Sequence, residues 1–99
     1  MIYFTPMDKY ELTIVLDGKS TPAKRKTVIS TIEKIITTFE GKIVKTEDWG
    51  EKEMYQKAGK NNPGYFIHFL LEFEKGSIKS LNLKLKMEED IRKFLLVRI

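Results

Sequence analysis

Residues 41–73 read GKIVKTEDWGEKEMYQKAGKNNPGYFIHFLLEF, and this stretch decides the fold. Its last part, from Gly64 to Phe73, is rich in aromatic and β-branched side chains and has no internal breaker, which is typical of a strand. Residues 42–46 predict a second strand. The polar, lysine-rich segment between them ends in Asn61-Asn62-Pro63-Gly64, a combination typical of a turn. The stretch therefore predicts two antiparallel strands joined by an extended polar arm.

The chain before this hairpin predicts one strand and one helix. Residues 10–16 place apolar side chains on one side and Glu11, Thr13 and Val15 on the other, as in a half-buried strand. Ser20-Thr21-Pro22 then predicts a helix start, with a hydroxyl cap and a proline in the first turn. Gly41 lies where a glycine is expected to end that helix. The predicted buried stripe of the helix is Val28, Ile32, Ile35, Ile36 and Phe39.

The chain after the hairpin predicts a second helix and a last strand. Ser77 is in position to cap a helix that begins at Ile78, and residues 91–99 predict an apolar strand. The order is β-α-β-β-α-β within a single domain of residues 1–99, in which residues 1–6 are predicted to be an N-terminal extension. This order predicts an α+β, ferredoxin-like fold, a four-stranded antiparallel sheet with both helices on one face.

The sheet face that the helices leave uncovered is predicted to bind a partner. Along the third strand, alternate residues from Tyr65 to Phe73 point toward the helices, so the residues between them point away. With neighbouring strands they make an apolar patch, and such a patch on an open sheet usually marks a binding site. The alternative is that the arm or the N-terminal residues fold over the patch. The predicted partner interface is Val15, Phe66, His68, Leu70, Leu95 and Val97.

The composition excludes several kinds of site. With no cysteine and one histidine, the chain has no disulfide, no thiolate zinc site and too few ligands for a histidine metal site. No apolar run is long enough to span a bilayer, and the first residues lack a signal-peptide pattern, so we predict a cytoplasmic protein. The net charge of +4 suits an RNA, membrane-surface or acidic-protein partner, and equally a protein whose surface is merely basic.

Five short motifs occur in a fixed order along most of the chain. Tyr10-Glu11 opens the first strand, and Gly41-Lys42-Ile43 precedes Glu47-Asp48-Trp49-Gly50. Gly64-Tyr65-Phe66 opens the third strand, and Asp90-Ile91-Arg92-Lys93 leads into the last. In this order and at this spacing, the motifs resemble those of the bacterial small-subunit ribosomal protein six family. Residues 51–57 depart from the arginine-rich run that the family usually has there.

The resemblance implies a structural component of the small ribosomal subunit, located in the cytoplasm, and not an enzyme. Such proteins pair with small-subunit ribosomal protein eighteen, and the pair binds the central domain of the small-subunit rRNA. No cofactor, metal or small-molecule substrate and no membrane is expected. The predicted phosphate contacts are basic residues of the arm and the last strand, namely Lys45, Lys52, Lys57, Lys60, Arg92, Lys93 and Arg98.

Several motifs have more than one interpretation. Trp49 could stack on a base or a partner, or pack at the base of the hairpin. His68 could be a pH-sensitive group, a ligand or part of the partner interface. The acidic runs 47–48 and 88–90 are interpreted as solvated turn residues in preference to a Mg²⁺ site. Three other classes share the fold. One is a ligand-sensing domain that dimerises through its sheet, and another is an RRM-like RNA-binding domain, whose third-strand spacing residues 64–69 do not match. The third is an enzyme such as an acylphosphatase, which needs a glycine-rich anion-binding loop with an arginine that residues 17–20 do not provide.

Overall fold

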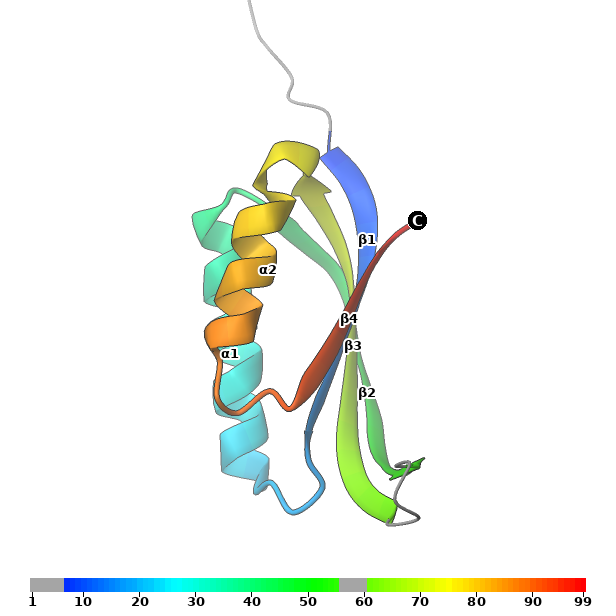
Figure 1. The fold of residues 1–99 in the computed structure, drawn as a ribbon. Helices are drawn as coiled ribbons and strands as arrows, with labels where there is room; N and C mark the ends of the chain where they lie inside the picture. The colour runs from blue at the N-terminus through cyan, green and yellow to red at the C-terminus, as the bar shows by residue number, and fades with distance from the viewer. Residues whose placement is uncertain (1–6, 56–60) are drawn as a thin grey trace, which may run out of the picture.

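Strands and helices follow one another in the predicted order. The computed structural model describes residues 7–55 and 61–99, so the extension predicted at residues 1–6 lies outside the described residues. The four strands form one antiparallel sheet in the order β2-β3-β1-β4. Both helices lie on one side of it (Figure 1), which confirms the α+β, ferredoxin-like fold. The elements are β1 (Met7–Asp17), α1 (Pro22–Thr38), β2 (Lys42–Tyr55), β3 (Asn61–Glu74), α2 (Ile78–Met87) and β4 (Lys93–Arg98).

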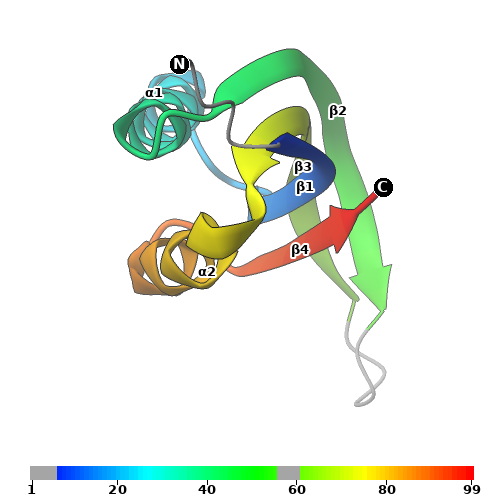
Figure 2. The same cartoon turned by 90° about the horizontal axis from the view of Figure 1, so that it is seen from above.

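The core lies between the sheet and the two helices, which run side by side over one face (Figure 2). Leu12 of β1 and Phe69 of β3 are opposite each other in the register of the two central strands, and both are completely buried. The inward side predicted for β3 is confirmed, because its alternate residues from Ile67 to Phe73 are buried as well. The helices complete the core with Val28, Ile32, Ile36, Leu81 and Leu85.

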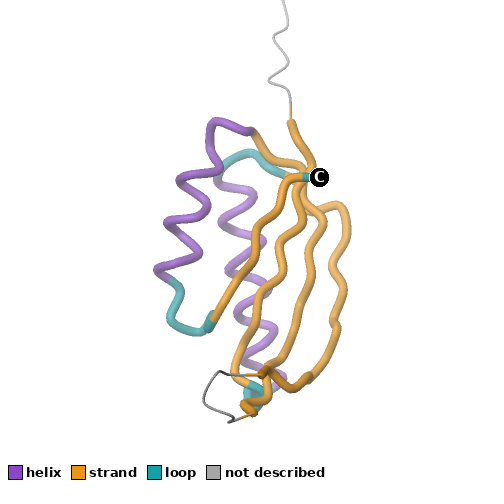
Figure 3. The backbone as a smooth tube through the Cα atoms, turned by 45° about the vertical axis from the view of Figure 1, so that its right-hand side comes forward, coloured by secondary structure: helices purple, strands orange, loops and turns teal. Residues whose placement is uncertain are grey.

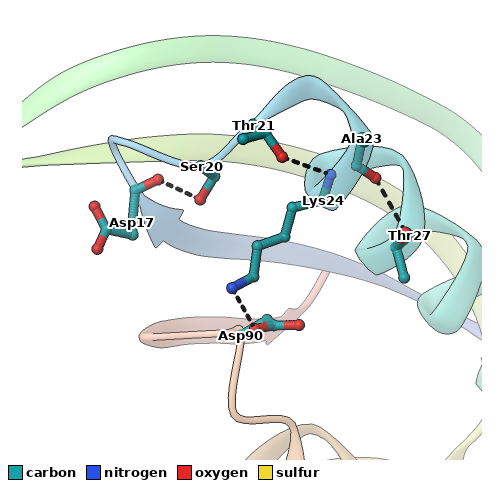
Figure 4. Close-up of polar contacts among 7 residues, drawn as sticks. All are labelled: Asp17, Ser20, Thr21, Ala23, Lys24, Thr27 and Asp90. Atoms are coloured by element: carbon teal, nitrogen blue, oxygen red, sulfur yellow. Dashed lines mark hydrogen bonds and ion pairs between the residues drawn. The ribbon is translucent and has the colours of Figure 1, made fainter.

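The start of α1 is fixed by the polar residues that the sequence places before it (Figure 4). The Thr21 hydroxyl accepts a hydrogen bond of 3.2 Å from the Lys24 N–H, so Thr21 is the cap and Pro22 opens the helix. The Ser20 hydroxyl instead donates to the Asp17 carbonyl at the end of β1. The Lys24 ammonium lies 3.0 Å from an Asp90 carboxylate oxygen, which links the first turn of α1 to the turn before β4.

The end of α1 differs from the prediction by one residue. The left-handed residue is Glu40, with φ of 60°, and not Gly41. The Glu40 N–H bonds to the Thr37 carbonyl and the Gly41 N–H to the Ile36 carbonyl, the two bonds of a Schellman motif. Gly41 is needed for another reason. A Cβ atom there would lie 2.7 Å from the Phe73 ring and 3.1 Å from the Glu72 carbonyl oxygen.

We expect Glu40→Gly to stabilise the protein by about 1 kcal/mol, because glycine adopts the left-handed conformation without the steric cost that Glu40 bears. Urea unfolding at 25 °C would measure the change. Glu40→Ala is the matched control, since it removes the same charge but keeps a Cβ atom, and it should give no stabilisation. Equal stabilisation by both variants would assign the effect to charge and contradict this explanation.

The hairpin is longer and more regular than predicted. Residues 47–55, assigned to the polar arm, continue β2 and pair with β3 back to Asn61, as the long strands of Figure 3 show. The turn predicted at residues 61–64 is therefore wrong, since these residues begin β3. β2 tolerates polar residues on both sides because it is an edge strand and its far side has no helix. Two bulges interrupt its register, between Ile43 and Lys45 and between Asp48 and Gly50.

The last two elements also differ in detail from the sequence interpretation. A 3₁₀ turn (Lys75–Ser77) precedes α2, and Ser77 occupies the cap position of α2 without a capping hydrogen bond from its side chain. The last strand is shorter than residues 91–99. Ile91 is buried in the turn before it, and β4 begins at Lys93. Phe94 and Leu96 pack against the core, whereas Leu95 and Val97 are exposed on the other side of the sheet, as predicted.

Candidate functional site

The open face, by which we mean the side of the sheet away from the helices, consists of cross-strand rows. Around Phe66 the row combines an aromatic ring, a valine and a lysine. Around His68 it combines polar and apolar groups, and around Leu70 two apolar side chains alternate with two charged ones. Such neighbours lie close enough to act as one surface. The rows are Gly50–Phe66–Val15–Lys93, Glu47–His68–Thr13–Leu95 and Lys45–Leu70–Glu11–Val97.

A shallow groove of about 520 Å³ crosses all four strands on this face. Its floor is mainly apolar, and Val15 at the bottom is only 7% exposed. Leu95 at the β4 side is 63% exposed and Trp49 at the β2 side is 41% exposed. A surface of this kind can bury apolar groups of a partner while lysine and glutamate remain at its borders. The residues that define the groove include Val15, Trp49, Phe66, His68, Lys93 and Leu95.

Trp49 and His68 form an aromatic stack at the β2 side of the groove. Their ring centroids are 4.5 Å apart and their planes differ by 7°. The indole N–H of Trp49 donates a 2.8 Å hydrogen bond to a Glu47 carboxylate oxygen, and the Nδ1 atom of His68 lies 2.9 Å from the Thr13 hydroxyl. Both rings are therefore held in position before any partner arrives. Trp49 is thus part of the groove. It packs against the hairpin, as one interpretation of the sequence predicted, and the residue it packs on is His68 of the open face.

Charged side chains of β2 hold the tryptophan in this orientation. The Lys45 ammonium lies 2.8 Å from Glu47, and it lowers the pKa of the Glu47 carboxyl, with a second contribution from the Trp49 N–H. The same contact raises the pKa of Lys45. The Lys52 ammonium lies 5.3 Å from the centre of the Trp49 ring, a cation–π contact. Because the Lys45–Glu47 ion pair is solvent-exposed, it adds little to stability, and its main effect is on the position of Trp49.

A second polar cluster holds β2 to the helix side of the sheet. The Tyr65 hydroxyl donates a 2.6 Å hydrogen bond to Asp48, which raises the pKa of Tyr65, and the Arg25 guanidinium lies 4.1 Å from the centre of the Tyr65 ring. The other Asp48 carboxylate oxygen accepts a 2.9 Å bond from the Gly50 N–H. These contacts give the acidic residues 47–48 structural partners. In the part of the chain that the structure describes, no three acidic or histidine side chains are placed to hold a metal ion.

A family model described as Ribosomal protein S6 matches residues 9–98, which is nearly the whole chain. The chain belongs to the ribosomal protein S6 family. This assignment confirms the predicted family and, with it, the small ribosomal subunit in the cytoplasm as the location. The family is structural and not enzymatic, and association with ribosomal RNA follows from membership. No helix among the described residues is long and apolar enough to cross a membrane.

Curated relatives agree with the family model. The protein named small ribosomal subunit protein bS6 of Pelagibacter ubique is 34% identical over 96 residues, which cover 89% of this chain and 79% of that protein. The protein of the same name from Magnetococcus marinus is 31% identical over 90 residues, covering 91% of this chain and 62% of that protein. The one from Alkaliphilus metalliredigens is 27% identical over 93 residues, covering 94% and 98%.

Solved structures support the fold. The crystal structure of 30S ribosomal protein S6 from Thermotoga maritima has a TM-score of 0.83 at 19% identity, covering 94% of this chain and 88% of that one. The P2 domain of the chemotaxis kinase CheA, solved in complex with the response regulator CheY, has a TM-score of 0.64 at 9% identity, covering 94% and 99%. Different proteins thus use this fold, so it is the family match that favours the ribosomal interpretation over the ligand-sensing and RRM-like alternatives.

The structure of this S6-family chain brings the predicted partner interface together on the open face. Phe66, His68 and Leu70 are half-buried there, and Leu95 and Val97 are exposed. The prediction for Val15 needs correction. It lies on the predicted face but is buried by its neighbours, so it contributes to the floor of the groove more than to an exposed contact surface. Trp49 lies over His68, and the sequence interpretation left it out of this interface.

The predicted phosphate contacts are less uniform. Lys93 borders the groove, and Arg92 beside it is exposed. Lys45 and Arg98 have acidic partners, since the Arg98 guanidinium lies 3.3 Å from Asp8 on the helix side of the sheet. Lys52 is exposed but contacts Trp49. The two remaining predicted contacts, Lys57 and Lys60, lie outside the described residues.

Proposed function

We propose that this protein is a structural, non-catalytic component of the small ribosomal subunit that binds the central domain of the rRNA together with small-subunit ribosomal protein eighteen. The observation that supports this function best is the groove on the open face. An exposed sheet face with Leu95 and Trp49 at its borders offers a partner protein apolar area to bury, and burial of apolar area stabilises association.

The proposed RNA contacts are the basic side chains beside this groove. Lys93 and Arg92 follow each other at the start of β4, and both are exposed. Lysine and arginine attract phosphates by charge, and the net charge of +4 adds a long-range attraction for RNA. Because Lys93 lies at the border of the groove, a partner that covers the groove and an rRNA helix that reaches Lys93 would meet at the same edge. This arrangement supports binding of the two proteins to rRNA as a pair.

Co-sedimentation with small ribosomal subunits tests the proposal directly. We expect the protein to migrate with the small subunit through a sucrose gradient at high salt, because many contacts formed together resist the screening that removes adventitious basic proteins. Recovery of the protein only at the top of the gradient, from subunits that retain their other proteins, would contradict the proposed function.

We expect replacing both Arg92 and Lys93 with alanine to weaken rRNA binding by the protein pair. The slope of log K against log salt should flatten by up to about two units, since each lost phosphate contact removes close to one. Filter binding of the pair to an rRNA central-domain fragment at several salt concentrations would measure both. Pairing itself should be preserved by calorimetry.

A matched control separates local contacts from net charge. Lys26 of α1 and Lys79 of α2 are exposed on the helix side. Their double alanine variant loses the same total charge, and we expect it to change the salt slope little. An equal loss of slope in both double variants would mean that Arg92 and Lys93 act only through net charge.

A further inference from the structure

The two edges of the sheet differ in how well they could accept another strand. The β2 edge is interrupted by two bulges, and Gly50 at the second has a φ of 77°. The Gly50 N–H is already bonded to the Asp48 side chain. Charged residues lie both before and after this bulge, at positions 47–48 and 51–52. Bulges and charges of this kind protect an edge against pairing. The β4 edge has no bulge from Lys93 to Arg98, because it pairs with β1 in a continuous register there, and its charged residues stand only at its two ends.

The ladder geometry shows which backbone groups of β4 remain available. The Ile99 N–H donates a 2.9 Å bond to the Lys9 carbonyl, in the register of the β1–β4 pair. In an antiparallel ladder, alternate residues bond to the same neighbouring strand. The backbone N–H and C=O groups of Lys93, Leu95 and Val97 therefore point toward β1. Those of Phe94, Leu96 and Arg98 point away from the sheet. Among the described residues no strand lies beyond β4.

The side chains along this edge continue the surface of the groove. Leu95 is 63% exposed, Val97 43% and Ile99 66%, and the first two lie on the open face. Lys93, at the beginning of β4, lies on the open face with them and borders the groove. A strand laid beside β4 would place its own alternate side chains next to these residues. It would satisfy three unpaired backbone positions and cover exposed apolar side chains at the same time.

We propose that the β4 edge binds an extended segment of the partner protein, which becomes a fifth strand of the sheet. The inference rests on the proposed function, because it gives the protein that covers the open face a second point of attachment. Backbone pairing supplies affinity in this binding mode, and side chains on alternate positions supply specificity. The segment carries apolar residues beside Leu95 and Val97 and a carboxylate or another acceptor beside Lys93.

A second copy of this chain is a poorer occupant of the edge. Residues 91–99 contain Arg92, Lys93 and Arg98 and no acidic residue. Pairing β4 with its own copy would therefore collect basic residues at one edge, in two molecules that each have a net charge of +4. Charge complementarity favours a different protein.

Hydrogen exchange on the isotope-labelled protein tests the inference, with small-subunit ribosomal protein eighteen as the probe. In the free protein, the amides of Phe94, Leu96 and Arg98 should exchange rapidly, while those of Leu95 and Val97 are already protected by β1. On pairing, the three outward amides should become protected at least tenfold. Calorimetry on the same samples shows whether the pair has formed.

A proline substitution provides a second measurement. Arg98→Pro removes one outward N–H and should weaken pairing roughly tenfold relative to Arg98→Ala, which loses the same charge and the same contact with Asp8. Near-ultraviolet circular dichroism would confirm that both variants fold.

The possible outcomes separate the two proposals. Pairing without protection of the three amides overturns the fifth strand and leaves the proposed function intact. Absence of pairing overturns both. Protection that appears on concentrating the free protein, without the probe, assigns the edge to a second copy and overturns the inference. Equal affinities of the two Arg98 variants, both folded, also contradict it.

Discussion

Replacing Phe69 with alanine is expected to cost about 3 to 5 kcal/mol of unfolding free energy. Phe69 is completely buried on a central strand, opposite Leu12 and under both helices. Alanine would lose the transfer free energy of the ring and leave a cavity that the surrounding core can fill only in part. Since small domains are stable by only about 5 to 15 kcal/mol, this one change would remove a large share of the total.

Urea unfolding at 25 °C, followed by far-ultraviolet circular dichroism, measures this effect. Leu70→Ala is the matched control, because Leu70 is the next residue on the same strand but faces the open side. It should cost about 1 kcal/mol, as expected for a partly exposed apolar side chain. A cost below about 1 kcal/mol for Phe69→Ala would show that the helices do not depend on this ring for their packing.

The second large effect is expected on pairing. Leu70 lies between Lys45 of β2 and Glu11 of β1 on the open face. Leu70→Lys should leave the isolated protein folded, because the new ammonium remains in water and has Glu11 beside it. In the pair the same group would be covered by the partner, and burying a charge without a partner costs several kcal/mol. We therefore expect calorimetry to detect no pairing with small-subunit ribosomal protein eighteen.

The choice of lysine makes the consequence for RNA informative. Leu70→Lys raises the positive charge, so a fall in rRNA binding by the mixture cannot come from weaker attraction to phosphates. Leu83→Lys is the control, because it makes the same chemical change at a distant position. Leu83 lies on α2 and is 62% exposed. It should pair normally. Normal pairing by Leu70→Lys, together with failed pairing by the Arg92/Lys93 double variant, would mean that the roles of the two surfaces are reversed.

Alternation in the sequence was sufficient to predict β1, the inner part of β3 and the two sides of β4. In each case one side of the strand is buried and the other is largely accessible, with buried Val15 of β1 as the exception, so the apolar residues follow the pleat of the strand. The burial of Leu12, Ile14 and Phe69 and the exposure of Leu95 and Val97 follow from this pattern alone. The same is true of α1, where helical spacing identified Val28, Ile32 and Ile36 as its buried residues.

The distal half of β2 could not be predicted in this way. Most of its residues are charged and show no apolar alternation, and the strand exists through its pairing with β3. The bulge between Asp48 and Gly50 also shifts the alternation by one residue. Trp49 and Lys52 consequently contact each other on the open face, although simple alternation would put them on opposite sides. The sequence interpretation left Trp49 out of the groove because it ended the strand at residue 46 and assigned the following residues to the arm.

The stack of Trp49 on His68 has a practical consequence. Trp49 is the only tryptophan of the chain, and it is 41% exposed at the border of the groove. Intrinsic fluorescence excited at the indole band therefore observes one surface location and not the hydrophobic core. A titration of the unlabelled protein with a tryptophan-free ligand would give an optical signal that arises at the contact surface itself. For the same reason, emission during denaturation follows the separation of β2 from β3, and circular dichroism is needed to follow the helices.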